Sequence, residues 1–331
     1  MILLCFQAVL LGLSTTSPLN AEERYHPPTS RVATTFIPEV EISIAGSDRV
    51  ITSNGIPASN HGTFPNPHNP HSISPQLHEF RVPLNPTLAS EITPVEFSLF
   101  GVALDGVPFD PGTAEYWNGD RYSGWRYEAL TGAMNLGLDE NHAHVQPQGA
   151  YHYHGLPTGL VEQLGAPQQM QLIGYAADGF PIYSSYGHED PNDLTSPVGE
   201  LKSSYVLKSG QRISGPGGTH NGTFVQDYEY RTGAGDLDEC NGRIGVTPDS
   251  ARPTYHYYVT TAFPFVPRCW RGVPDRSFRH RPLANRPEAG QRRGPQPPPQ
   301  HPPHMETPSH EERGPFSPHG RPPGPPLHRG E

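Results

Sequence analysis

A short pattern that occurs twice limits what this chain can fold into more than any other feature. Residues 100–109 read FGVALDGVPF, and residues 173–182 read IGYAADGFPI. In both, an apolar run leads into Asp-Gly, which is a strong signal for a tight turn, and the proline that follows stops a central strand from continuing. Each occurrence therefore predicts an apolar β-strand that ends in a turn.

Further segments are repeated in the same order. The first set is Leu138–Asn141, Val145–Pro147 and Tyr151–His154, and the second set is Leu237–Asn241, Val246–Pro248 and Tyr255–Tyr258. The repetition predicts two internal copies, at about residues 95–157 and 168–262. Two copies are too few for a solenoid, which needs about three units to bury a core. We therefore expect a single, mainly β domain, built as a pseudo-twofold β-sandwich or a barrel-like fold. The 41 prolines and 35 glycines agree with this, because they disfavour long helices.

The first copy contains a histidine-rich segment with the spacing of a β-hairpin. His142 and His144 are separated by one residue, as are His152 and His154, so each pair lies on one face of an extended strand. Between the pairs, Pro147–Gly149 suits a three-residue loop that ends in a left-handed glycine. Such a loop places His144 opposite His152 and His142 opposite His154. A loop one residue shorter or longer would divide the histidines between the two faces.

Four imidazoles on one face of a hairpin can converge on a divalent ion. We expect zinc or copper(II), since nitrogen ligands suit both and no thiolate is nearby. In the second copy only His256, which matches His152, is retained, and Gly245 and Tyr258 stand where the first copy has His144 and His154. The alternative is that the histidines form no more than a polar strand face. The predicted metal ligands are His142, His144, His152, His154 and His256.

The sequence Tyr151-His-Tyr-His154 resembles the signature of the YHYH-domain family. Other segments fit the same family, among them Gly101–Trp117, Asp178–Tyr183, Leu237–Arg243 and Tyr255–Thr260. The resemblance covers roughly residues 37–272, and we expect a YHYH domain at about residues 35–272. It implies a secreted protein. The biochemical role of the family is poorly defined, so the resemblance settles little about function.

The two ends of the chain are expected to lie outside this domain. Residues 1–21 contain an apolar run followed by small and polar residues, which is typical of a signal peptide and is too short to span a membrane. Residues 275–331 are rich in proline, arginine and histidine and predict a disordered, extended tail. No later segment predicts a membrane span, and no basic stretch interleaved with aromatics predicts nucleic-acid binding. We therefore expect a secreted or periplasmic protein.

The cysteines fit export. Cys5 would leave with the signal peptide, so Cys240 and Cys269 remain as an even pair and predict a disulfide. Closing a loop of about thirty residues is worth roughly 3 to 4 kcal/mol in the chain-entropy model. Asn221-Gly-Thr223 is a glycosylation sequon, which matters only in a cell that glycosylates such sites.

Four aspartates stand at repeated positions. Asp105 and Asp178 each begin an Asp-Gly-apolar-Pro pattern, and we expect them to form turns rather than to act in catalysis. Asp139 and Asp238, each followed by a glutamate (Glu140 and Glu239), adjoin the two hairpins; these carboxylates could orient histidines by accepting their ring N–H groups, although surface carboxylates are the default.

Together these features predict an exported protein that holds zinc or copper through the first-copy hairpin. It could be a metalloenzyme of unknown substrate, and no serine elbow, P-loop or other catalytic pattern predicts a competing enzyme class. The alternative is a non-enzymatic extracellular binding module whose aromatic side chains and loops contact a glycan or a surface protein.

Overall fold

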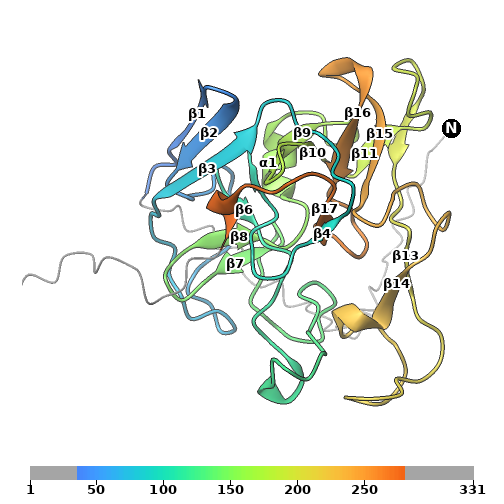
Figure 1. Cartoon of the computed structure of the whole chain (residues 1–331). Coiled ribbons are helices and arrows are strands. Elements are labelled where there is room, and N and C mark those ends of the chain that lie inside the picture. The colour runs from blue at the N-terminus through green and yellow to red at the C-terminus, as the bar shows by residue number, and fades with distance from the viewer. Residues whose placement is uncertain (1–35, 280–331) are drawn as a thin grey trace, which may run out of the picture. The chain divides into compact units, whose positions relative to one another are not determined.

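The computed structural model describes residues 36–279 (Figure 1). The predicted signal peptide, residues 1–21, and residues 280–331 of the predicted tail lie outside the described residues. The fold is mainly β, as predicted. Helical structure in the described part is limited to α1 (Thr158–Gln163) and to 3-10 turns at Trp117–Gly119, Val225–Asp227 and Arg276–Phe278. None of these helices is long and apolar enough to cross a membrane.

Eight strands form the central sheet. In spatial order they are β15 (Gly242–Thr247), β16 (Ser250–Tyr258), β10 (Pro181–Tyr183), β9 (Leu172–Ala176), β5 (Gly101–Ala103), β6 (Pro108–Phe109), β8 (Tyr151–Tyr153) and β7 (Ala143–Val145). At the centre β5 pairs antiparallel with β9. Outward from this pair, β6 pairs parallel with β8, and β10 pairs parallel with β16. The antiparallel hairpin partners β7 and β15 form the two edges, so the same succession of pairings leads from the centre to either edge.

The central sheet is open. Its edge strands β7 and β15 do not pair with each other in the part of the chain that the structure describes, so the predicted barrel-like closure is wrong. Closure requires long strands that tilt and stagger around a common axis. The strands that follow the two Asp-Gly turns are only two and three residues long, and each begins with a proline. The duplicated sandwich stays a prediction.

Four smaller sheets surround the central one. The largest is β1 (Val40–Ala45), β2 (Asp48–Ser53) and β3 (His78–Pro83), and the two-stranded sheets pair β11 (Tyr186–His188) with β12 (Val198–Glu200), β13 (Tyr205–Leu207) with β14 (Tyr228–Tyr230), and β17 (Cys269–Trp270) with β4 (Thr93–Pro94). The predicted disulfide is confirmed, because Cys240 is bonded to Cys269 at the start of β17.

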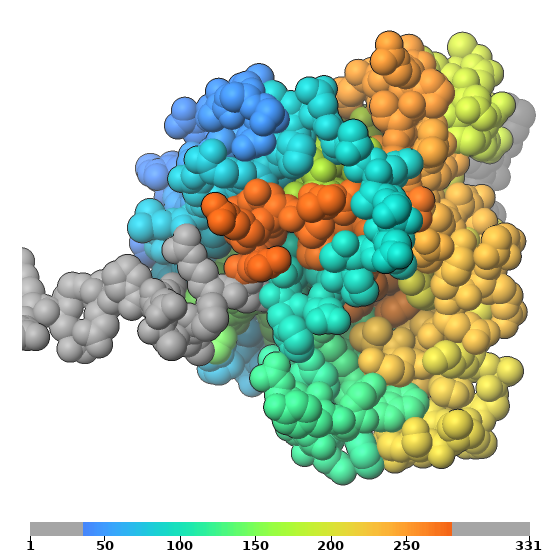
Figure 2. All heavy atoms as spheres, in the orientation of Figure 1, coloured from blue at the N-terminus to red at the C-terminus, as the bar shows by residue number. Residues whose placement is uncertain are grey.

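The folded part extends beyond the predicted start of the tail. The chain after β17 lies across one face of the molecule, beside the segment that contains β4 (Figure 2). Phe278 is buried there and stacks on Phe80 of β3 with ring centroids 4.6 Å apart. Residues 275–279, which the sequence assigns to the tail, are thus packed against the domain. The composition of the whole tail predicts disorder, but the single side chain of Phe278 buries enough apolar area to hold the short segment around it.

The repeated aspartates Asp105 and Asp178 lie at the expected turns and accept hydrogen bonds from strands of the central sheet. Asp105 accepts a hydrogen bond of 2.7 Å from the Tyr153 hydroxyl, and Asp178 accepts one of 2.6 Å from the Tyr257 hydroxyl. Burial, which these hydrogen bonds only partly offset, raises the pKa of each aspartate to about 6. Each carboxyl therefore ties an Asp-Gly turn to the hairpin strand beside it.

Candidate metal centre

The histidine-rich hairpin forms with the predicted loop. The Gln146 N–H donates to the Ala150 carbonyl at 2.9 Å, and the Gly149 N–H donates back to the Gln146 carbonyl at 2.8 Å. Gly149 has a φ of 88°, which is the left-handed conformation that closes such a loop. His144 on β7 is paired with His152 on β8. Local turn chemistry therefore sets the register that brings these two rings to one face.

The alternation along β8 separates an apolar face from a histidine face. The Tyr151 hydroxyl donates to Asp139 at 2.6 Å, and Tyr153 packs against Phe109 in the core. His152 and His154 point to the other face, and each is only 2% exposed. Burial of two imidazoles side by side is costly unless their nitrogens are paired or ligated.

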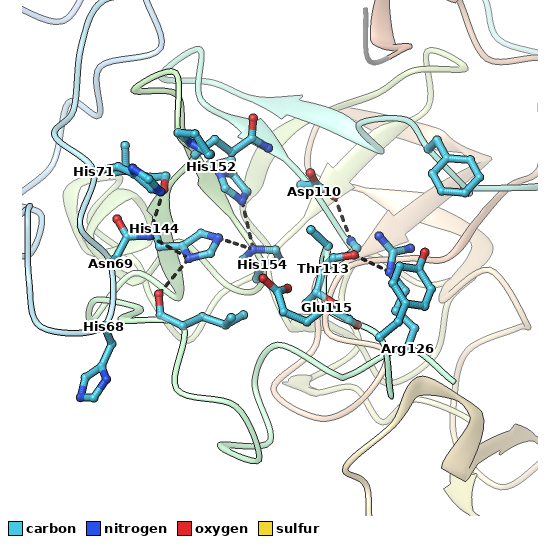
Figure 3. A pocket seen from close by; sticks show the side chains of 18 of the residues that line it. His68, Asn69, His71, Asp110, Thr113, Glu115, Arg126, His144, His152 and His154 are labelled. Atoms are coloured by element: carbon cyan, nitrogen blue, oxygen red, sulfur yellow. Dashed lines mark hydrogen bonds between the residues drawn. The ribbon is translucent and has the colours of Figure 1, made fainter. Parts of the chain in front are cut away.

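Three ring nitrogens meet at one point on this face (Figure 3). The Nε2 atom of His154 lies 3.0 Å from Nε2 of His152 and 3.1 Å from Nε2 of His144. Nitrogens that bind one ion tetrahedrally at about 2.0–2.1 Å lie roughly 3.3 Å apart. The three imidazoles thus have close to the spacing of a metal ligand set. They are the one such group among the described residues.

The other ring nitrogens decide which tautomer is present. Nδ1 of His144 lies 3.0 Å from the Leu136 carbonyl, and Nδ1 of His152 lies 3.3 Å from the Ala150 carbonyl. A carbonyl oxygen only accepts, so each Nδ1 carries the hydrogen and each Nε2 keeps a lone pair. The Asn69 amide nitrogen is also 3.4 Å from Nδ1 of His144, but its shorter bond, 2.9 Å, goes to the Val145 carbonyl.

Hydrogen bonding alone does not satisfy this arrangement. If Nε2 of His154 carries a hydrogen, it can donate to the lone pair of only one neighbour, Nε2 of His152 or Nε2 of His144. The other Nε2 lone pair would then lie against His154 with no hydrogen between them. Nδ1 of His154 is buried with no hydrogen-bond partner among the described residues. A cation shared by the three Nε2 atoms would accept all three lone pairs at once. The donor set therefore fits a metal ion better than it fits a neutral network.

Protonation of His144 and His154 is disfavoured. Burial lowers the pKa of His154 well below its ordinary value, and the nearby rings of His152 and His144 lower it further. Burial also lowers the pKa of His144, although the Leu136 carbonyl and the charge of Glu115 act in the opposite direction. Neutral imidazole is the form that binds metals.

A cavity of about 730 Å³ opens beside the three histidines. Asp110 and Glu115 line it (Figure 3), and the charge of Asp110 acts on His154 while that of Glu115 acts on His144. The Asp110 N–H donates to the Tyr153 carbonyl at 2.9 Å, directly after the strand β6. Because Phe109 faces the core, the alternation turns Asp110 to the histidine face. Sequence reasoning missed these two carboxylates, and the signal that could have found Asp110 is its position one residue after a core-facing strand residue.

Two predicted ligands lie outside the histidine group. His142 is opposite His154 in the backbone pairing, since the His154 N–H donates to its carbonyl at 2.8 Å. However, His142 has a φ of 55°, so its ring leaves the strand face, and its Nδ1 lies 2.8 Å from the Leu156 carbonyl instead. The prediction for His142 assumed that side chains alternate between the two faces throughout the segment. This alternation holds only from Ala143, where β7 begins.

His256 belongs to a separate set of residues. It is paired with Arg243, so the residue that corresponds to His144 is Arg243 and not Gly245 as the sequence alignment indicated. The register shifts between Gly245 and Thr247, where one residue of β15 faces three residues of β16, so Val246–Pro248 does not correspond to Val145–Pro147. Nδ1 of His256 lies 2.9 Å from the Thr254 carbonyl, and its Nε2 accepts a hydrogen bond of 2.8 Å from the Tyr258 hydroxyl.

The two sets can be compared position by position. We call His144, His152 and His154 the first frame, and Arg243, His256 and Tyr258 the second frame. In the second frame a tyrosine hydroxyl satisfies the histidine, and the Arg243 guanidinium donates to the His188 carbonyl at 2.5 Å. In the second frame both ring nitrogens of His256 therefore have hydrogen-bond partners without an ion, whereas Nε of Arg243 is buried with no partner among the described residues.

The carboxylates beside the hairpins do not orient the histidines. Asp139 accepts from the backbone N–H groups of Asn141 and Ala143 and from Tyr151, and Asp238 accepts in the same way from Cys240, Gly242 and Tyr255. Their role is to fix the turn that leads into each hairpin. Backbone carbonyls orient the histidine rings instead.

Comparisons with known proteins agree with the resemblance seen in the sequence. The sequence model of the family described as YHYH protein matches residues 79–272, which include both frames and Asp110. No curated protein and no solved structure matches the chain. The matched stretch is more than half of the 331 residues, and the chain belongs to the YHYH protein family.

Proposed function

We propose that the first frame binds one divalent zinc or copper ion through the Nε2 atoms of His144, His152 and His154. The observation that carries the proposal is the orientation of His144 and His152, whose Nδ1–H groups are held by the Leu136 and Ala150 carbonyls. Fixing one ring nitrogen by a backbone carbonyl is the usual way in which a protein aims the other nitrogen at a metal.

The proposed site has the character of a catalytic rather than a closed structural centre. Structural zinc sites have four protein ligands, whereas catalytic sites have three and leave one position open. A divalent ion in such a site acts as a Lewis acid and lowers the pKa of a coordinated water. Asp110 and Glu115 line the cavity beside the histidines and offer carboxylates that can accept a proton there. A metal-assisted hydrolase is the reaction class that these groups fit best.

We also propose that the domain arose from an internal duplication, with copies at about residues 95–157 and 168–262. Three matched features support it: the pairing succession of the central sheet, the Tyr–Asp hydrogen bonds under both Asp-Gly turns, and the Asp139 and Asp238 turns. After such a duplication the first frame kept or gained metal ligands, whereas in the second frame a tyrosine hydroxyl is hydrogen-bonded to the remaining histidine.

Export to a secreted or periplasmic location is proposed on chemical grounds. The Cys240–Cys269 disulfide joins residues 29 positions apart, and disulfides of this structural kind persist mainly in oxidising compartments. The proposed metal site is the same whether the protein is secreted or periplasmic.

The proposal is tested by elemental analysis of purified protein without an affinity tag. We expect about one equivalent of zinc or copper, which a chelator removes and which returns on reconstitution. Changing His152 and His154 together to alanine should abolish binding, because each lost ligand costs more than the 10- to 100-fold that is typical for lost supporting groups. His142→Ala and His256→Ala are matched controls that should keep the metal, since both rings lie outside the first frame.

A double variant that keeps stoichiometric metal would exclude the first frame as the site. Metal-free wild-type protein that fails to take up either ion would favour the alternative of a non-enzymatic module that binds a glycan or a surface protein.

A further inference from the structure

The cavity beside the histidines has a second polar end, formed by Arg126. The side chain lines the cavity beside Thr113, on the side away from His68 and His144 (Figure 3). We infer that Arg126 binds the oxyanion of a small ligand, a carboxylate or a phosphate group, in this cavity. Arg126 presents a planar fork of N–H donors, which matches the geometry of both groups.

Neighbouring groups hold the guanidinium in place. Its Nε–H donates to the Thr113 carbonyl at 2.6 Å, and the Tyr116 ring lies 5.6 Å from the guanidinium carbon. Gly112 packs directly against the terminal nitrogens, and a Cβ at this position would overlap them. The glycine thus leaves the space that the guanidinium occupies. A side chain fixed in this way loses little entropy when it binds an anion.

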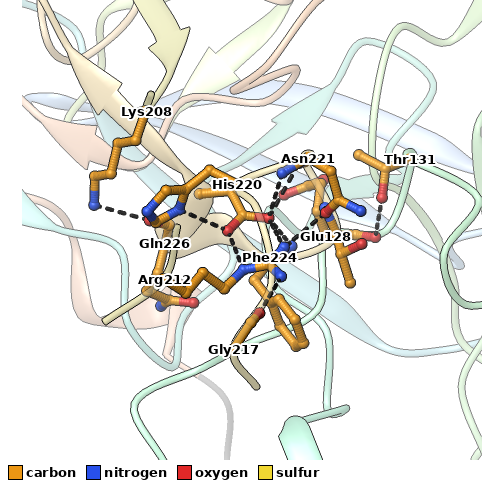
Figure 4. A network of polar contacts seen from close by, with 12 residues as sticks. Glu128, Thr131, Lys208, Arg212, Gly217, His220, Asn221, Phe224 and Gln226 are labelled. Atoms are coloured by element: carbon orange, nitrogen blue, oxygen red, sulfur yellow. Dashed lines mark hydrogen bonds and ion pairs between the residues drawn. The ribbon is translucent and has the colours of Figure 1, made fainter. Parts of the chain in front are cut away.

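The backbone of Arg126 is also fixed. Its N–H donates to the Gln226 side chain at 2.8 Å, and its carbonyl accepts from the Val225 N–H at 2.9 Å. The turn that contains both partners is held by a buried ion pair of 2.6 Å between Arg212 and Asp227, part of a larger polar network (Figure 4). Segments that are far apart in the sequence therefore position Arg126 as part of a rigid wall.

Arg126 differs from Arg268, the other half-buried arginine nearby, in having no ion-pair partner within the part of the chain that the structure describes. Arg268 is paired with Glu128 at 2.6 Å, whereas Arg126 makes no ion pair within 4.0 Å with any described residue. Burial lowers the pKa of Arg126, since its charge is partly removed from water and the attraction of Tyr116, Asp110 and Glu128 does not compensate. A ligand oxyanion supplies the missing counter-charge.

The cavity size limits the ligand to a small molecule. A volume of about 730 Å³ lies within the range of about 300–1,000 Å³ that is usual for small-molecule sites. Binding of the anion itself does not need the metal. We further infer that one ligand spans from Arg126 to the histidines, and this part rests on the proposed function. Such a substrate would have an anionic group at one end and a polar group that binds the metal at the other.

The anion site is tested with chelator-treated protein, so that the metal plays no part. Calorimetric titration with acetate and with inorganic phosphate should show saturable binding of at least one of them. Arg126→Gln should weaken it by about 10- to 100-fold, the usual effect of losing a charge-assisted hydrogen-bonded pair. Arg121→Gln is the matched control, because Arg121 lines the same cavity but is exposed, and it should change the affinity less than about threefold.

Gly112→Ala tests the site without removing the charge. The new methyl group displaces the guanidinium, so anion affinity should fall although Arg126 is present, and circular dichroism should show an unchanged fold. Binding that is absent from the wild type, or equal in the wild type and Arg126→Gln, would overturn the inference.

Zinc-loaded protein tests the spanning ligand separately. Succinate should bind at least tenfold more tightly than acetate, and either Arg126→Gln or the His152/His154 double change should remove this gain. If acetate or phosphate binds through Arg126 but zinc is not taken up, the anion site stands and the proposed function fails. If zinc binds and succinate gains nothing over acetate, the spanning ligand is refuted.

Discussion

The second frame shows how to remove the proposed metal site without leaving a hole. We predict that changing His144 to arginine and His154 to tyrosine together converts the first frame into a copy of the second and abolishes metal binding. In the second frame the Tyr258 hydroxyl lies 2.8 Å from Nε2 of His256, so a tyrosine at 154 should donate to His152 in the same way. Arginine at 144 would find the carboxylates of Asp110 and Glu115 in the adjacent cavity.

The expected magnitude follows from linkage. A ligand present at about 100 times its dissociation constant stabilises the folded state by about 2.7 kcal/mol. In a domain of this size, about 1 kcal/mol shifts the melting temperature by about 2–4 °C. Chelation should therefore lower the melting temperature of the metal-loaded wild type by about 5–10 °C. The double variant has no metal to lose, and its melting temperature should not respond to the chelator.

Differential scanning fluorimetry with and without a chelator, together with elemental analysis, measures both effects. His142→Ala serves as the control on the same hairpin and should respond to the chelator like the wild type. The reasoning fails if the folded double variant still contains one equivalent of metal, or if it loses as much stability on chelation as the wild type.

Three further predictions concern the fold. Gly149→Ala should lower the free energy of unfolding by about 1–3 kcal/mol in a denaturant titration, because its φ of 88° disfavours a side chain and a Cβ would overlap Ser74; an unchanged midpoint would contradict the assigned loop. Burial lowers the pKa of His256 from its ordinary 6.5 to about 4, so the neutral ring stabilises the fold above pH 6.5 and this stability is lost as the pH falls towards 4. The loss between pH 7 and pH 5 should be about 2 kcal/mol, and folded His256→Gln should show a correspondingly smaller decrease in chemical denaturation. Non-reducing mass analysis should find Cys240 and Cys269 two hydrogens lighter than two thiols, and reduction should cost roughly 3 to 4 kcal/mol of stability, whereas two freely alkylated cysteines would refute the pairing.

Local chemistry in the sequence determined the hairpin. The proline and glycine of the loop specify its length, and the two-residue period of a strand then brings His144, His152 and His154 to one face. The disulfide followed from an even cysteine count, and the mainly β class from repeated turn signals and frequent proline. These features depend on residues that are close in sequence or on simple counting, so no knowledge of the tertiary structure was needed.

Tertiary structure alone decided which predicted residues share a site. The left-handed backbone at His142 turns its ring away, and the pairing of β15 with β16 places Arg243, not Gly245, opposite His256. Asp110 joins the histidines only because β6 pairs in parallel with β8, a contact between segments some forty residues apart. Periodicity describes which way side chains alternate within a strand. It does not record where a backbone leaves that period or which distant strand lies beside it, because both are set by packing and hydrogen bonds across the whole sheet.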